Sequence, residues 1–176
     1  MQPEFLGTFC FTFGWRLTLK NEVKNDSEKS FAAPVLALDV GQKRVGAAVS
    51  DSLSISITRL EAIPRTNWKH LLSVVDQLIK SFDAKTLVIG LPLRLNGSAG
   101  EAAEEIRSVA ANFAKSLDLP VYLQDERLTS RQAEENLRET GRRGPQVSAL
   151  VDSEAAAVIL NDFLVPGQHR IRVESS

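Results

Sequence analysis

From residue 34 onward, short apolar runs alternate with stretches of helical periodicity. The first two runs are separated by a short turn at 41–44 and are predicted to pair as an antiparallel hairpin. The run at 86–90 is continuously hydrophobic, which is typical of parallel strands covered by helices on both faces. The predicted strands are 35–40, 45–50, 55–63, 86–90 and 120–124.

Four amphipathic or apolar stretches are predicted as helices, and three of them begin at recognisable caps. Asn67 is predicted to cap the first helix, which ends near residue 82. Ser98 with Glu101, and Thr129 with Gln132, have the spacing of capping boxes for the second and third. The closing helix is predicted at about 147–164. An antiparallel three-strand start, followed by strand and helix alternations, predicts an α/β fold of the ribonuclease H-like kind, a mixed sheet with helices on both faces.

The first 33 residues follow a different pattern and are predicted to be an N-terminal extension outside the core. Aromatic residues alternate with small or polar ones over 9–15, and a polar run follows at 20–30. The segment is a poor signal peptide, because Glu4 and no basic residue precede the aromatics. The predicted division is an extension at 1–33, one folded domain at 34–165 and a C-terminal tail at 166–176.

Composition limits the class of protein further. A chain of 176 residues with 43% hydrophobic residues can bury one self-sufficient core. The net charge of −1 lacks the basic excess of many nucleic-acid-binding proteins, so any such surface must be local. The single cysteine, Cys10, excludes an intramolecular disulfide, and the chain has no charge-free apolar run of ~18 residues. We therefore expect a cytoplasmic protein with no membrane partner.

Three acidic positions are the candidate chemistry: Asp39 near the end of an apolar strand, Asp125-Glu126 at the end of another, and Asp152 near the start of an apolar helix. At ~100° per residue, Asp152 shares a helical face with core residues such as Ile159, so its carboxylate is predicted to point inward. A buried carboxylate requires a metal, another cation or a shifted protonation state.

Each acid also has a purely structural interpretation. Asp39 could bond backbone amides in the following turn, and Asp152 could stabilise the positive end of its helix with one oxygen in water. The pair Asp125-Glu126 could be a solvated strand end; of the two, Glu126 is the one we expect to face the site.

Taken together, the acids favour a single site for Mg²⁺ or Mn²⁺, since Mg²⁺ prefers oxygen ligands. Two such ions can activate water and stabilise the leaving oxygen of a phosphodiester, which indicates a metal-dependent nuclease. Both histidines, His70 and His169, lie outside these motifs, which argues against a zinc site or a Ser-His triad.

Four segments resemble the YqgF/RuvX family in the family's order. They are 38–51 (LDVGQKRVGAAVSD), 88–93 with Asn96-Gly97-Ser98, 125–130 (DERLTS) and 151–156 (VDSEAA). The resemblance spans about 34–164 and implies a ribonuclease H-like nuclease that processes the 5′ end of the 16S ribosomal RNA precursor. The family has also been described as a Holliday junction resolvase. By this resemblance, Asp39, Glu126 and Asp152 match the family's acidic residues.

Basic residues near the acids supply local positive charge that could bind a phosphate backbone. Each is also a common kind of solvated surface charge, and their grouping is what favours a binding role. The candidate substrate-binding residues are Lys43, Arg44, Arg127, Arg142 and Arg143.

Several alternatives stay open at this point. A hairpin with Asp-x-Gly followed by Lys-Arg also suits the phosphate cradle of actin-like and sugar-kinase ATP-binding proteins, but those use two such domains. A non-catalytic RNA- or ribosome-binding module of the same fold is the second alternative. The nucleic-acid partner is expected to be a structured RNA precursor, with branched DNA as the alternative. The chain would act as a monomer or, on a two-fold junction, as a homodimer.

Overall fold

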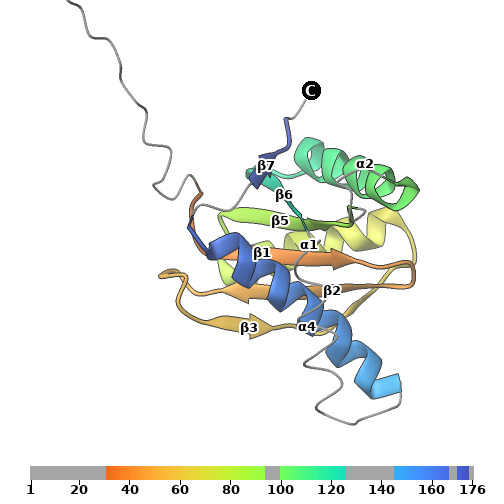
Figure 1. Ribbon diagram of the computed structural model, residues 1–176, viewed down its shortest axis with the longest axis horizontal. Helices are drawn as coiled ribbons and strands as arrows, with labels where there is room; N and C mark the ends of the chain where they lie inside the picture. The colour runs from red at the N-terminus through yellow and green to blue at the C-terminus, as the bar shows by residue number, and fades with distance from the viewer. Residues whose placement is uncertain (1–30, 94–99, 126–144, 167–169, 175–176) are drawn as a thin grey trace, which may run out of the picture.

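The structure is a computed structural model that describes residues 31–93, 100–125, 145–166 and 170–174. In these residues, seven strands form one sheet, on which three helices pack (Figure 1). The strands are β1 (Val35–Val40), β2 (Arg44–Ser50), β3 (Ile57–Arg59), β4 (Ile63–Pro64), β5 (Thr86–Leu91), β6 (Val121–Asp125) and β7 (Arg170–Arg172). The helices are α1 (Trp68–Phe82), α2 (Glu101–Ser116) and α4 (Pro145–Leu164). No helix among the described residues is both long and apolar enough to cross a membrane.

The sheet is mixed, as predicted, with the strand order β3-β2-β1-β5-β6-β7 and with β4 also paired to β2. β1 and β2 form the predicted antiparallel hairpin. β5 is parallel to β1, β6 is parallel to β5, and β7 adds an antiparallel edge beyond β6. β1 therefore lies in the middle of the sheet.

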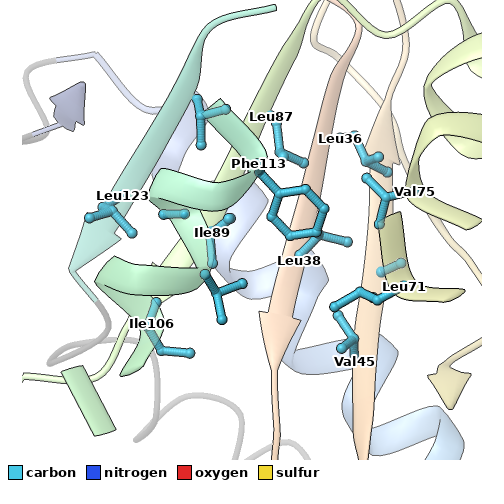
Figure 2. Close-up of a cluster of buried hydrophobic side chains, with 14 of the residues drawn as sticks. Leu36, Leu38, Val45, Leu71, Val75, Leu87, Ile89, Ile106, Phe113 and Leu123 are labelled. Carbon is cyan, nitrogen blue, oxygen red and sulfur yellow. The ribbon is translucent and has the colours of Figure 1, made fainter. Parts of the chain in front are cut away.

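Helices cover both faces of the sheet, α1 and α2 on one and α4 across the other (Figure 1). The alternation of side chains along β1 divides its residues between the two cores. Leu36 and Leu38 belong to the core under α1 and α2, where Phe113 of α2 packs (Figure 2). Val35 and Ala37 belong to the core under α4. The members from α4 are Ala156, Ala157, Ile159, Leu160 and Phe163.

The helix starts agree only in part with the predicted caps. The Asn67 side chain accepts a hydrogen bond from the backbone N–H of His70 at 2.9 Å, which confirms the predicted cap of α1. The predicted start of α2 was wrong, because its N-cap residue is Gly100 and no side chain caps it. Glu101 and Glu104 in the first turn instead place negative charge at the positive end of the helix. Ser98 and the helix predicted near 129–141 lie outside the described residues.

Three further features differ from the sequence prediction or add to it. The predicted third strand is two short strands, β3 and β4, because residues 60–62 between them are not in strand conformation. The strand β7 was not predicted. Phe31, just before the predicted domain, is 8% exposed and packs against Phe163 with ring centroids 4.8 Å apart. The division into extension, domain and tail stays a prediction.

Candidate active site

Asp39 lies near the carboxyl end of the central strand and shares the α4 face with Val35 and Ala37. Its side chain is largely removed from water. This burial, together with the negative charge of Asp152 as the smaller cause, raises the pKa of Asp39 to about 6. The structure therefore brings Asp39 and Asp152 close enough for their charges to interact.

Gly46 is what allows α4 to approach Asp39. It pairs with Asp39 across the hairpin, so the two residues face the same side of the sheet. A Cβ atom built on Gly46 would lie 1.8 Å from the backbone carbonyl oxygen of Asp152. Since no side chain fits in that space, the first half of α4 can rest directly on β2, next to Asp39.

The Asp152 side chain is 28% exposed, but its Oδ2 atom is buried. The Nε atom of Arg44 is 3.0 Å from Oδ2 and forms an ion pair with it. The approach does not have hydrogen-bond geometry, because Oδ2 accepts no hydrogen bond from the described residues. One carboxylate oxygen at this site is thus buried beside a positive charge and still lacks a donor.

Two contacts on the other side of Asp152 fix the position of α4. The Ser153 hydroxyl is buried and donates to the carbonyl of Leu60 at 2.5 Å, in the segment between β3 and β4. Glu154 accepts two hydrogen bonds from Arg59 of β3, from Nε at 2.6 Å and from Nη2 at 3.0 Å. These contacts hold the helix to the sheet edge just after Asp152.

The remaining candidate residues are placed as follows. Asp125, at the end of β6, shares the alternation of Val121 and Leu123, which pack in the core of the opposite face, so it does not face Asp39.

Lys43 is exposed in the turn between β1 and β2. Glu126, Arg127, Arg142 and Arg143 lie outside the described residues. Within the residues that the structure describes, no group of three or more His, Cys, Asp or Glu side chains could hold a metal ion.

Two residues of this region were missed by the sequence analysis. Gly46 interrupts an otherwise apolar strand, and a glycine there indicates close approach of another backbone. Gln124 is a polar residue in the apolar strand β6 and is 2% exposed on the α4 face. In both cases the residue type at a buried strand position was the available signal.

The fold and this acidic pair define an α/β protein of the ribonuclease H-like class, with one carboxylate near the carboxyl end of the central strand and one in the first half of the helix that crosses it. A family model described as "RuvX: Holliday junction resolvase" matches residues 33–165, and the chain belongs to this RuvX family.

Proteins named "Putative pre-16S rRNA nuclease" are similar to most of the chain. The protein of Gloeothece citriformis is 43% identical over 73% of this chain and 85% of its own length. That of Syntrophus aciditrophicus is 35% identical over 74% of this chain and 87% of its own length. The structure of T. thermophilus RuvC in complex with a Holliday junction substrate has a TM-score of 0.45 at 16% identity and covers 71% of this chain and 90% of that one.

Proposed function

We propose that this protein is a divalent-metal-dependent nuclease of the cytoplasm that hydrolyses phosphodiester bonds at the 5′ end of the 16S ribosomal RNA precursor. The observation that carries the proposal is the meeting of Asp39 and Asp152, which are far apart in the sequence, at one end of the central strand. Membership of the RuvX family and the names of the similar proteins support the choice of reaction and substrate.

The donor atoms fit a hard divalent cation such as Mg²⁺ or Mn²⁺. Burial makes the charged form of Asp39 unfavourable, and Asp152 Oδ2 is buried beside Arg44 without a hydrogen bond, so a divalent cation would compensate the charge of Asp39 and give Oδ2 a ligand. We propose Glu126 as the third ligand, because Asp125 faces the other side of the sheet. When bound, such ions supply an activated water nucleophile and stabilise the charge that develops on the phosphate oxygens.

The basic residues are proposed to hold the substrate strand. Arg44 is paired with Asp152, so a phosphate bound at its guanidinium would lie beside the acids. Lys43 projects from the neighbouring turn, where it could bind the strand as it leaves the site. The proposed substrate-binding residues also include Arg127, Arg142 and Arg143.

The test is cleavage of a precursor 16S ribosomal RNA end by the full chain with Mg²⁺ or Mn²⁺. Asp39→Asn keeps the size of the side chain but removes its charge, and it should lose cleavage by at least about 100-fold. Asp76→Asn is the matched control, because Asp76 lies on α1 and pairs with Lys80 at the surface of the opposite face. Equal cleavage by the wild-type protein and Asp39→Asn would refute the proposed site.

A second function, resolution of branched DNA, is favoured by the description of the matching family model. A four-way DNA junction in the same assay separates the two substrates. Cleavage of the junction but not of the RNA would replace the proposed substrate. Binding of RNA without cleavage at any metal concentration would indicate the non-catalytic RNA- or ribosome-binding module instead.

A further inference from the structure

Gln124 is a buried amide with an unsatisfied acceptor. The residue is 2% exposed, and its Oε1 atom accepts no hydrogen bond from any described residue. A buried polar atom of this kind destabilises the folded state, because the chain gives up a hydrogen bond to water and gains none. An apolar side chain of similar size would avoid that loss, so the glutamine calls for an explanation other than packing.

Gln124 lies level with Asp39 on the same face of the sheet. It pairs with Gly90 of β5, and the preceding residue of β5, Ile89, pairs with Leu38 of β1. Continuing that ladder by one residue sets Gly90 between Gln124 and Asp39. Two strand spacings separate them, about 10 Å between Cα atoms. Since Gly90 has no side chain, nothing from β5 stands between the amide and the carboxylate.

Arg170, the positively charged neighbour of Gln124 on β7, makes its hydrogen bonds to other groups. Arg170 of β7 pairs with Gln124 in the sheet, but its guanidinium donates to the backbone carbonyls of Phe163 at 2.9 and 2.7 Å and Val165 at 2.9 Å. It also lies over the rings of Phe31 and Phe163. Arg170 therefore stabilises the end of α4 and does not supply the donor that Oε1 lacks.

We infer that Gln124 is a positioning residue of the acidic site, whose Oε1 accepts a hydrogen bond from water in the hydration shell of a cation held by Asp39 and Asp152. The inference rests on the function proposed above. An amide oxygen is a neutral acceptor with two lone pairs, and Mg²⁺ keeps several of its waters when bound to protein. The two-strand separation suits contact through water better than direct ligation. Groups that hold the outer shell of a metal site commonly change its affinity 10- to 100-fold.

The experiment measures Mn²⁺ binding to the full chain by calorimetry, without nucleic acid, and thermal unfolding in EDTA. Gln124→Met keeps the length of the side chain and removes the acceptor, so we expect about 10-fold weaker Mn²⁺ binding together with an unfolding midpoint at or above that of the wild type. Gln124→Glu keeps an acceptor oxygen and should bind Mn²⁺ at least as tightly as the wild type. Thr86→Val is the control, because the buried Thr86 hydroxyl donates to the carbonyl of Ala32 at the opposite end of β5. It should lower the midpoint without changing Mn²⁺ affinity.

Each outcome separates this inference from the proposed function. Mn²⁺ binding that is equal in the wild type and Gln124→Met would overturn the role of Gln124 and leave the acidic site intact. If Gln124→Met and Gln124→Glu both had a lower midpoint of thermal unfolding and weaker Mn²⁺ binding than the wild type, the amide would serve stability alone. Absence of Mn²⁺ binding by the wild-type protein would refute the proposed metal site, and the role of Gln124 with it.

Discussion

Replacement of Asp39 by asparagine is expected to stabilise the metal-free protein while it abolishes cleavage. Burial and the charge of Asp152 raise the pKa of Asp39 from 3.8 to about 6, so the folded protein holds this proton more tightly than the unfolded chain. The contribution of the Asp39 carboxyl to the free energy of unfolding is fully present below pH 3.8 and is lost as the pH rises through about 6. The difference between these two pKa values, at about 1.4 kcal/mol per pH unit, lowers the free energy of unfolding by roughly 3 kcal/mol once the pH is well above about 6.

Asparagine carries no charge at any of these pH values and avoids the penalty. In EDTA, Asp39→Asn should therefore be more stable than the wild type by roughly 1 kcal/mol at about pH 4.5 and by roughly 3 kcal/mol at about pH 7.5. The larger difference corresponds to a shift of about 6–12 °C in the midpoint of thermal unfolding. Urea unfolding at the two pH values gives the free energies directly.

Two controls make this prediction specific to the site. Asp76→Asn, which changes an exposed carboxylate on α1, should differ from the wild type by less than about 0.5 kcal/mol at both pH values. Added Mn²⁺ should stabilise the wild type and not Asp39→Asn, so the difference in unfolding free energy between the two proteins should become smaller. A variant that is less stable than the wild type at pH 7.5, or a difference that does not grow with pH, would refute the electrostatic reasoning.

Two further predictions concern the packing of α4. Gly46→Ala places a methyl group where the carbonyl of Asp152 lies, so we expect a loss of about 1–3 kcal/mol in unfolding free energy, measured in urea, and at least 10-fold slower cleavage. Unchanged stability and cleavage would mean that α4 does not rest on β2. Arg59→Gln breaks the ion pair with Glu154, but Arg59 is 51% exposed, so the loss should stay below about 1 kcal/mol and should shrink at high salt. A larger or salt-independent loss would contradict this.

Local patterns were sufficient to predict the position of each acid within its own element. The apolar run around Asp39 identified a buried strand, and helical periodicity placed Asp152 on the face that carries Ala156 and Ile159, both of which are buried. The mixed sheet followed from the order of strands and helices. These features depend on residues within about ten positions of each other, which is the range that periodicity describes.

The contacts that join the acids could not be predicted in this way. The approach of α4 to Gly46 depends on two segments far apart in the sequence, as do the bond from Ser153 to Leu60 and the pair of Arg59 with Glu154. The strand β7 was missed for a related reason, because three residues are too few for an alternation pattern. Side-chain alternation in β6 separates Asp125 from the site, and the choice of Glu126 made from the sequence remains a prediction.

The polar groups on the α4 face together argue that this end of the sheet is maintained for binding. Asp39 is buried with a raised pKa, Asp152 Oδ2 lacks a hydrogen-bond donor, and so does Gln124 Oε1. The burial of Asp39 and of Gln124 Oε1 lowers the stability of the folded protein, and a neutral or apolar replacement would remove that loss, whereas Asp152 Oδ2 has the ion pair with Arg44. Their grouping at one level of the sheet is explained most simply if a single ligand satisfies all three, and a cation with its waters has the charge and the donors to do so. A protein under selection for stability alone would have no reason to keep them together, which is why stabilisation and loss of metal binding are expected in the same variants.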